Sequence, residues 1–520
     1  MSVDHNNKTF YITSPLYYVN DIPHVGSAYT TIACDTIARY KRLRGFDVCF
    51  LTGTDEHGQK IARAAKLENR SPQEHCDFIS ARFKELWDLL NIRYDRFSRT
   101  TSKIHEKIVH EFFNRVYKKG DIYEADYEGL YCEGCEDFKS EKDLTDEKLC
   151  PIHKQKVQEY KEKNYFFALS KYEKKLTEYF DRNPDFIQPS YRKNEVLGWV
   201  KEGLRDFPIT RRTVSWGIPV PNESNQTIYV WFDALLGYLS GLLNADNSST
   251  IESATKKYWP CSVHVIGKDI LRFHAVYWPC MLMSAGLPLP QKVFGHGFLT
   301  KDGEKMGKTT GNIIDPYELV KEFGTDAVRF FFLKEISFGK DGDYSRSNFI
   351  NRINSDLANN LGNLLNRTLN LAHKNYNGVI ESRKADDFLG LKDSTISTIN
   401  TYEKHMDKLE LKEALDVLWE LIDSTNRAFN AKAPWKLIKQ NEKDTAQSCL
   451  YETLNILRNI SILINPFIPE TSIKIYSQLG FNEPDLYNEW EKLGWKSKEE
   501  CFKLNEAKPV FPRIDITKTI

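Results

Sequence analysis

The spacing of apolar and polar residues divides the chain into two parts. In roughly the first three hundred residues, short apolar runs alternate with segments in which apolar residues recur at helical spacing. The first helical segment extends to near Gly45, and another is expected to start near Asp269. The predicted strands are 9–13, 48–52, 228–231, 262–266 and 292–294. Strands that alternate with helices in this way predict a parallel α/β sheet.

The remainder of the chain is predicted to be helical. Helices are expected at 316–323 and 325–334, and from about residue 350 the pattern has helical spacing almost throughout. Apolar residues recur on one helical face at Leu361, Leu364, Leu365 and Leu369. The sequence therefore predicts a helical bundle after the α/β region.

Residues from about 120 to 225 break the α/β pattern with short, polar, β-like segments and a cluster of possible metal ligands. Cys132 and Cys135 are separated by two residues, and Cys150 and His153 repeat this spacing fifteen positions later. Four such ligands suit a tetrahedral Zn²⁺ ion in a closed, structural site. We interpret the segment as an insertion between two halves of one nucleotide-binding fold, held together by one zinc ion.

Two distant stretches carry the strongest sign of chemistry. His24-Val25-Gly26-Ser27 follows the first predicted strand and begins a helix, where free N–H groups and the helix dipole favour phosphate. Lys305-Met306-Gly307-Lys308-Thr309 is a loop with two lysines three residues apart. Together they predict an ATP site, and no Gly-x4-Gly-Lys-Ser/Thr loop is present to suggest a different one.

These two stretches resemble the HIGH and KMSKS motifs of class I aminoacyl-tRNA synthetases. From Tyr11 to Arg513 the chain is similar to the methionyl-tRNA synthetase family in its bacterial and organellar, single-zinc form. Two positions depart from the family pattern. Ser27 stands where a second histidine is usual, and Gly307 stands where the first serine of KMSKS is usual.

The resemblance implies a fold and a division of the chain. The fold class is α/β: a split Rossmann-like, parallel-sheet catalytic domain with a zinc-containing insertion, followed by an all-α helical-bundle anticodon-binding domain. The expected parts are 1–119 for the first catalytic half, 120–226 for the connective insertion, 227–297 for the second half, 298–349 for the KMSKS-type loop and stem-contact region, and 350–520 for the anticodon-binding domain.

The resemblance also implies an activity, the ATP-dependent ligation of L-methionine to tRNA(Met) through methionyl-adenylate, with release of AMP and pyrophosphate. The implied catalytic residues are His24, Lys305 and Lys308, and Mg²⁺ would accompany ATP. The implied ATP contacts are His24, Gly26, Ser27, Asp269, Lys305 and Lys308. The methionine carboxylate is already a nucleophile, so catalysis is expected to come from positioning and charge stabilisation.

Family residues that bind methionine and the anticodon map onto this chain as well. The implied methionine pocket consists of Leu16, Tyr18, Asp55, Trp231, Ala234, Leu235, Tyr238, Ile270, Phe273 and His274. Asp55 is the natural partner of the substrate ammonium group, and the aromatic rings suit a thioether. The implied anticodon contacts are Asn363, Arg367 and Trp435. Unpaired bases are commonly bound by stacking and by hydrogen bonds to their edges.

Composition bounds these expectations. The 72 basic and 72 acidic side chains cancel, so positive charge for tRNA must be concentrated on one face. No apolar window approaches ~18 residues and the N-terminal residues carry no leader pattern, so we expect a cytoplasmic protein without a membrane span. The ten cysteines are not expected to form a disulfide framework. No appended dimerisation domain follows Arg513, so a monomer is expected.

Three alternatives stand beside the leading hypothesis. The first is a relative specific for isoleucine, valine or leucine, but the large editing insertion that such a resemblance would imply is absent. A cysteine-specific relative would use a metal to hold the substrate thiol, whereas the predicted knuckle already has four ligands. The third is an RNA-binding relative without ligase activity, which only Ser27 and Gly307 favour.

Overall fold

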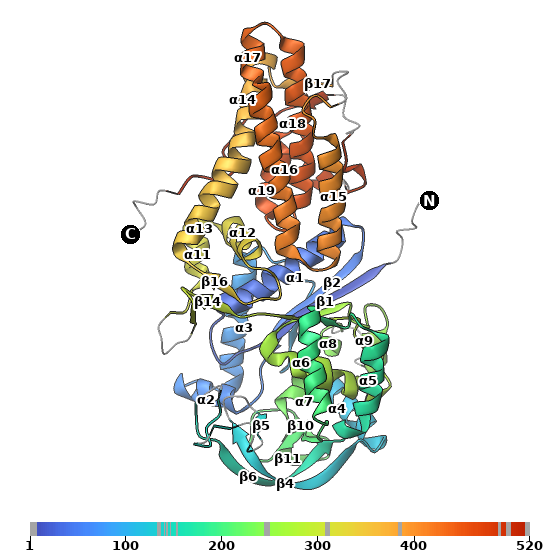
Figure 1. Cartoon of the computed structure of the whole chain (residues 1–520). Coiled ribbons are helices and arrows are strands. Elements are labelled where there is room, and N and C mark those ends of the chain that lie inside the picture. The colour runs from blue at the N-terminus through green and yellow to red at the C-terminus, as the bar shows by residue number, and fades with distance from the viewer. Residues whose placement is uncertain are drawn as a thin grey trace.

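The computed structural model describes residues 8–132, 137–139, 141, 144–145, 147–151, 154–243, 250–306, 312–382, 387–486, 490–495 and 501–514. An α/β half carries the central sheet, and a bundle of long helices stands on it (Figure 1). In the described part of the chain, no helix is long and apolar enough to cross a membrane.

Six parallel strands form the central sheet in the order β3-β2-β1-β12-β13-β7. Their bounds are Arg96–Arg99 (β3), Asp47–Asp55 (β2), Thr9–Tyr18 (β1), Val263–Gly267 (β12), Val293–His296 (β13) and Ile187–Gln188 (β7). The strand order reverses between β1 and β12, and ligands of such sheets bind beyond the carboxyl ends of the strands at this point. The expected α/β fold is confirmed.

Helices of the α/β half cover the sheet. Those of the first part are α1 (Val25–Leu43), α2 (Gln59–Leu67), α3 (Pro72–Leu89) and α4 (Lys103–Lys118). Those of the second part are α7 (Val230–Leu235), α8 (Gly237–Ser240), α9 (Ile251–Thr255) and α10 (Trp278–Ala285), with a 3₁₀ turn at Lys268–Ile270 and a π-helical turn at Phe273–Tyr277. Helix α1 is buried along nearly its whole length, so its N-terminus is held firmly at the sheet edge.

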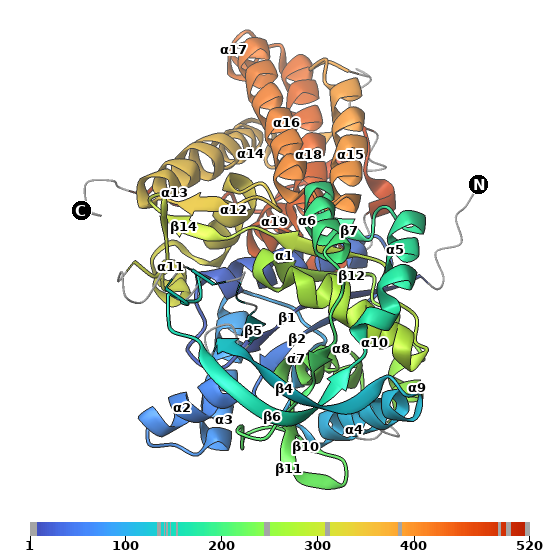
Figure 2. The ribbon, with the colours of Figure 1, turned by 60° about the horizontal axis from the view of Figure 1, so that its bottom comes forward.

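Residues between the two halves form a second, antiparallel sheet. Figure 2 shows β4 (Ile122–Cys132) and β6 (Gln158–Phe167) as a long ribbon, to which β5 (Asp137–Lys139) and β8 (Phe207–Pro208) add. The segment also contains a 3₁₀ turn (Leu169–Tyr172), α5 (Glu173–Arg182) and α6 (Ser190–Lys201). A smaller sheet consists of β9 (Thr210–Arg211), β10 (Pro219–Val220) and β11 (Glu223–Ile228).

One predicted strand is wrong. The run 228–231 was expected to be extended, but β11 ends at Ile228 and α7 begins at Val230. A short apolar run has no periodicity of its own, and its conformation is decided by neighbours farther along. Buried residues continue at helical spacing through Phe232, Leu235, Leu236 and Leu239, which favours the helix.

A three-stranded sheet and two helices lead into the bundle. They are β14 (Leu299–Lys301), β15 (Glu304–Lys305), β16 (Gly342–Tyr344), α11 (Pro316–Phe323) and α12 (Thr325–Glu335). The bundle contains α13 (Arg346–Arg352), a π-helical segment (Ile353–Gly362), α14 (Asn363–Tyr376), α15 (Lys392–Asp407), α16 (Leu411–Lys432), α17 (Pro434–Lys439), α18 (Lys443–Ile464) and α19 (Pro469–Gln478). After α19 come α20 (Glu483–Leu486), a 3₁₀ turn (Trp490–Lys492) and β18 (Cys501–Lys503), which pairs with β17 (Val379–Glu381) from between α14 and α15.

A buried ion cluster joins the bundle to the α/β half. The carboxylate of Asp35 on α1 binds Arg39 and Arg329, each at 2.7 Å, and all three side chains are at most 3% exposed. Arg329 lies on α12 and also donates to the carbonyl oxygens of Pro466 and Phe467 in the bundle. Since a buried ion pair is costly to break, this cluster fixes the two parts relative to each other.

Candidate functional site

The first predicted motif lies at the N-terminus of α1, beyond the carboxyl end of β1. The imidazole of His24 caps the helix, because its Nδ1 accepts the N–H of Gly26 at 3.0 Å. A Cβ on Gly26 would lie 2.8 Å from Cε1 of His24. Glycine at this position therefore leaves the space into which the histidine ring folds back over the backbone.

Ser27 has a local role that its position in the motif did not reveal. Its hydroxyl donates to the carbonyl oxygen of His24 at 2.7 Å and accepts the N–H of His24 at 3.2 Å. The side chain is 5% exposed. This departure from the family pattern therefore gives the helix a capping box, with the hydroxyl committed to the helix's own backbone.

The protonation state of His24 follows from these contacts. Although His24 keeps exposed surface, desolvation by the chain packed around it lowers the pKa of the imidazole below its ordinary value, and the nearby Asp21 carboxylate opposes that shift. In the neutral ring, acceptance at Nδ1 places the proton on Nε2. His24 therefore presents one N–H donor beyond the helix N-terminus.

A second histidine, which the sequence did not single out, lies at the end of β13. Nε2 of His296 is 2.8 Å from the hydroxyl of Thr30 on α1, and Nδ1 is 2.7 Å from the carbonyl oxygen of Gly297. Burial lowers the pKa of His296, while the Gly297 carbonyl and Asp269 oppose the shift. Asp269, a predicted ATP contact, therefore lies close to the same strand end. A histidine two residues after the predicted strand 292–294 is the signal that could have identified it.

The lysine motif is only partly described. Lys305 pairs with Thr300 in the hairpin of β14 and β15, while the Lys305 side chain and all of Gly307, Lys308 and Thr309 lie outside the described residues. The hairpin is fastened by β16 and the residue before it. Asp343 accepts the hydroxyl of Thr300 at 2.6 Å, and Asp341 accepts the ammonium group of Lys268 at 2.7 Å. Lys268 directly follows β12 and precedes Asp269. The ion pair between Lys268 and Asp341 therefore ties the hairpin to the carboxyl end of β12.

An aromatic wall lies beside this edge of the sheet. The rings of Trp231 on α7 and Phe273 on the π-helical turn stack with centroids 3.8 Å apart and planes 5° apart. The hydroxyl of Tyr238 is 2.7 Å from Nε2 of His274, whose Nδ1 lies 3.0 Å from the carbonyl oxygen of Ile270. Burial lowers the pKa of His274 to about 4, with the Ile270 carbonyl opposing. His274 is therefore neutral at pH 7, with its proton on Nδ1.

The other predicted pocket residues adjoin this wall. A Cβ on Gly237 would lie 2.2 Å from Cδ1 of Leu16, so α8 packs closely against the Leu16 side chain of β1 at this glycine. Asp55 pairs with Tyr18 in the register of β1 and β2, and it is 7% exposed. The Asp55 carboxylate is also close enough to Tyr238 to add to the raised pKa of that phenol, which burial dominates. Ala234 and Leu235 are buried on α7.

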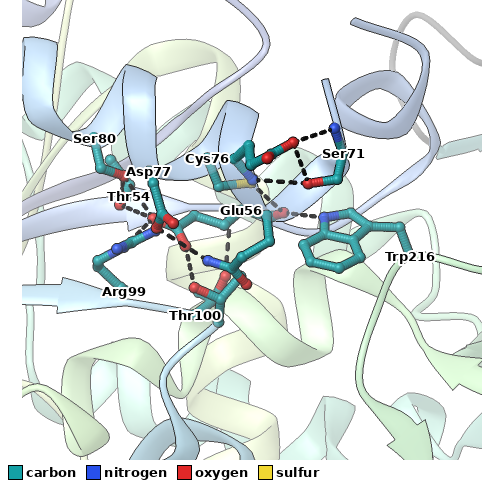
Figure 3. A network of polar contacts seen from close by, with 12 residues as sticks. Thr54, Glu56, Ser71, Cys76, Asp77, Ser80, Arg99, Thr100 and Trp216 are labelled. Carbon is teal, nitrogen blue, oxygen red and sulfur yellow. Dashed lines mark hydrogen bonds and ion pairs between the residues drawn. The ribbon is translucent and has the colours of Figure 1, made fainter. Parts of the chain in front are cut away.

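Glu56 fixes the segment that carries Asp55 (Figure 3). Its fully buried carboxylate accepts the hydroxyls of Thr54 and Ser80, each at 2.6 Å, and Nε of Arg99 at 2.7 Å. Its carbonyl oxygen accepts Nε1 of Trp216 at 2.6 Å. A buried carboxylate needs such partners, because an unpaired polar group in the interior is costly. The network therefore holds the chain rigidly on both sides of Glu56.

A polar groove lies between the π-helical segment, α14 and α16. It has a volume of about 540 Å³ and is lined by Asn363 and Arg367 together with Asn359, Asn360 and Asn430. The guanidinium of Arg367 lies 5.0 Å from the ring centre of Trp435 and donates to Oδ1 of Asn430 at 2.8 Å. The structure therefore brings together the three residues predicted to contact an anticodon.

The predicted zinc ligands are described for two of four positions. Cys132 and Cys150 are buried, and Cys150 starts a tight turn in which the N–H of Lys154 donates to its carbonyl oxygen at 2.7 Å. Cys135 and His153 lie outside the described residues. Within the ranges that the structure describes, no three His, Cys, Asp or Glu side chains are grouped to hold a metal ion.

Comparison with known proteins agrees with the fold and shows the family. Residues 10–159 and 140–369 match the family model described as tRNA synthetases class I (M), and residues 383–514 match the anticodon binding domain of methionyl tRNA ligase. The chain thus has the three features of a class I aminoacyl-tRNA synthetase: an α/β sheet with ligands expected at this edge, the His24–Ser27 motif at the N-terminus of α1, and a helical bundle.

Similar chains and structures identify the member of this class. The chain is 52% identical to the chloroplastic/mitochondrial methionine–tRNA ligase of Arabidopsis thaliana, over 98% of this chain and 83% of that protein. It is 49% identical to the methionine–tRNA ligase of Nostoc sp., over 100% of this chain and 99% of that protein. The chain belongs to the methionyl-tRNA synthetase family.

A solved structure supports the same identification. Methionyl-tRNA synthetase of Mycobacterium tuberculosis, in complex with methionyl-adenylate, is 40% identical to this chain with a TM-score of 0.92. The likeness covers 97% of this chain and all of that one. The match to the methionyl member disfavours the alternatives specific for other amino acids.

Proposed function

We propose that this protein ligates L-methionine to tRNA(Met) in two ATP-dependent steps, through methionyl-adenylate. The observation that carries the proposal is that the Trp231–Phe273 wall and the Asp55 carboxylate occupy the same edge of the sheet, where α1 begins. An apolar, aromatic pocket with one carboxylate suits an amino acid that has a free ammonium group and a thioether side chain.

The first step is the attack of the methionine carboxylate on the α-phosphorus of ATP, which breaks the bond to pyrophosphate. Asp55 would hold the substrate ammonium group, so that the carboxylate points toward the phosphates. His24 would donate from Nε2 to the phosphates above the α1 N-terminus. Lys305 and Lys308 would bind the leaving pyrophosphate, and Mg²⁺ bound with ATP would neutralise phosphate charge.

The remaining proposed ATP contacts fit the same place. Gly26 allows the His24 ring to fold over the backbone, and Ser27 caps the helix, so both would shape the phosphate site without binding phosphate through their side chains. Asp269 would contact the nucleotide from the end of β12. The second step transfers the methionyl group to the terminal 2′-hydroxyl of the tRNA, with release of AMP.

The polar groove is the proposed anticodon site. Asn363 and Arg367 would form hydrogen bonds with base edges, and Trp435 would stack on a base. Arg367 is held in place by Asn430 and by the Trp435 ring, so little side-chain freedom is lost on binding. This would explain how a chain without net charge binds one tRNA selectively.

We also propose one structural Zn²⁺ ion in the insertion, bound by Cys132, Cys135, Cys150 and His153. Two buried cysteines, one of them in a tight turn beside the bridge from Leu149 to Lys156, fit the donor set of a zinc knuckle. With all four positions filled by protein ligands, the metal would stabilise the insertion and take no part in ligation.

Aminoacylation of tRNA tests the whole proposal. Transcripts of tRNA(Met) with the anticodon CAU should be charged with methionine, and the same transcript with an altered anticodon should be charged at a rate at least roughly a hundredfold lower. Equal charging of both transcripts would contradict the groove as an anticodon site. No charging of either, with methionine activation intact, would contradict the proposed ligase function.

A further inference from the structure

A buried carboxylate on α7 binds two histidines that the proposed reaction does not use. Oδ2 of Asp233 lies 2.6 Å from Nδ1 of His57, and Oδ1 lies 2.5 Å from Nε2 of His105. Nδ1 of His105 is in turn 2.7 Å from the hydroxyl of Ser240. Asp233 and His105 are fully buried, and His57 is 6% exposed.

The cluster is stable because each oxygen of the carboxylate has its own donor. Burial by itself would raise the pKa of Asp233, but His57 and His105 lower it to about 2. Asp233 is therefore ionised at neutral pH, and each ring needs only one N–H to satisfy it. Removal of either partner would leave a buried charge poorly compensated.

The cluster connects the two sides of the proposed amino-acid pocket. Asp233 lies on α7, two residues after Trp231 and directly before Ala234. His57 lies two residues after Asp55, at the end of β2. The contact between Asp233 and His57 therefore spans from the aromatic wall to the segment with the carboxylate that would bind the ammonium group.

The His57 side of this connection is held by hydrogen bonds on both sides of His57. Glu56 is fixed by its own network, and the indole of Trp216 donates to the Glu56 carbonyl oxygen at 2.6 Å (Figure 3). The N–H of Gly58 donates to the carbonyl oxygen of Trp216 at 3.0 Å, and the His57 and Trp216 rings lie 5.7 Å apart. With this segment fixed, the contact from His57 to Asp233 sets where α7 lies.

We propose that Asp233 is a positioning residue for amino-acid binding: through His57 it holds the Trp231 wall at a fixed distance from Asp55. This inference rests on the proposed methionine activation. A shift of ~1 Å between binding groups can cost on the order of a hundredfold in rate, so a rigid link of this kind has a measurable effect. Asp233 itself would not contact the amino acid.

Exchange of pyrophosphate into ATP, with the full chain and no tRNA, tests this role. Asp233→Asn keeps the shape of the side chain but turns an amide N–H₂ toward one imidazole N–H. The variant should raise the KM for methionine by roughly tenfold or more, while the KM for ATP stays within about threefold. Glu452→Gln is the matched control, since Glu452 is a buried carboxylate in the bundle that accepts the N–H groups of Phe388 and Leu389 at 2.7 Å.

The control separates positioning from stability. Glu452→Gln should lower the melting temperature and leave both KM values unchanged, because exchange without tRNA does not use the bundle. If Asp233→Asn likewise lowers only the melting temperature, the proposal is overturned. If the unaltered protein shows no exchange with methionine, the proposed function itself is contradicted, and the inference that rests on it is contradicted too.

A second pair of variants applies if Asp233→Asn does not fold. His57→Ala removes the donor to Asp233, whereas His57→Asn keeps an amide donor near the position of Nδ1. We expect His57→Ala to raise the KM for methionine by roughly tenfold and His57→Asn to restore most of that loss. Equal impairment in both variants, or impairment in neither, would overturn a role that acts through Asp233.

Discussion

The rings of Trp231 and Phe273 stack face to face with their centroids 3.8 Å apart, although they come from α7 and from the π-helical turn after β12. Phe273 also meets the ring of Tyr277 edge to face. A π-helical turn adds a residue to a helical turn and is frequent at functional sites. The turn at Phe273–Tyr277 sets the angle at which Phe273 meets the indole, so the two rings form one flat wall.

Loss of this wall should weaken methionine binding selectively. Phe273→Ala removes an aromatic pair worth ~0.5–1.5 kcal/mol beyond the area that it buries, so the KM for methionine should rise by roughly tenfold. Phe481→Ala is a matched control, since Phe481 stacks on Tyr476 in the bundle at 4.9 Å. Pyrophosphate exchange measured at varied methionine checks both variants, and an equal effect of the two would contradict the assignment of the wall.

Gly26→Ala should impair catalysis without weakening the fold. The new Cβ would lie 2.8 Å from Cε1 of His24 and displace the imidazole, so exchange should fall by roughly 10²-fold, as for loss of one preorganised donor. The melting temperature should change little, because the helix propensity gained with alanine offsets the loss of the His24 cap.

Gly198→Ala serves as the control for this substitution. Gly198 lies in α6, and a Cβ there would meet nothing within 4 Å. It should stabilise the protein by ~0.5–1 kcal/mol and leave exchange unchanged. Normal exchange in Gly26→Ala would show that the position of the His24 ring does not matter for activation.

Burial of His274 should make the protein less stable in mild acid. Its pKa is about 4 in the fold against 6.5 ordinarily, so the unfolded chain takes up the proton first as the pH falls. The stability from keeping this ring neutral is fully present above pH ~6.5 and is lost toward pH ~4, at up to ~1.4 kcal/mol per pH unit. Urea unfolding of the native protein and of His274→Gln at several pH values checks this. The variant should have the shallower dependence, and equal slopes would contradict the prediction.

Arg367→Ala should affect only the reaction that includes tRNA. Loss of a base contact of ~1–3 kcal/mol should raise the KM for tRNA(Met) by roughly 10–100-fold, with pyrophosphate exchange unchanged. Arg427→Ala is the matched control, because Arg427 lies on α16, is exposed and donates to the hydroxyl of Ser424 at 2.9 Å. Parallel losses in both variants would point to general charge attraction in place of base recognition.

Metal analysis should find one zinc ion for each chain. Cys150→Ser should abolish the zinc and lower the melting temperature, because the proposed metal would hold together the turn that carries these ligands. Cys501→Ser is the control, since Cys501 lies in β18, within the bundle. A full zinc content in Cys150→Ser would contradict the proposed ligand set.

The sequence predicted those features that depend on nearby residues. The strands 48–52, 262–266 and 292–294 lie within or overlap β2, β12 and β13, because each is an apolar run bounded by polar residues. The helices α5 and α6 of the insertion were not predicted, and the run 228–231 was misassigned, because packing across the fold decides short segments.

The site residues that could be predicted are likewise those whose position depends on nearby residues. Asp55 ends β2 and His24 lies between β1 and α1, so their place at the sheet edge could be predicted. Asp233 could not be connected with His57 and His105, because its partners lie 176 and 128 residues away in the chain. A single carboxylate within the apolar run Trp231–Leu236 was the only local sign of it. The predicted domain boundaries and residue roles stay predictions for the experiments above.

The central claim is that this site activates methionine, and pyrophosphate exchange without tRNA tests it most directly. The exchange should be compared for methionine, homocysteine, leucine, isoleucine, valine and cysteine with the same zinc-loaded protein. We predict exchange with methionine well above the others, with homocysteine next, because one methylene is worth only ~1–3 kcal/mol in an apolar pocket. No exchange with methionine, or greater exchange with another amino acid, would contradict the account.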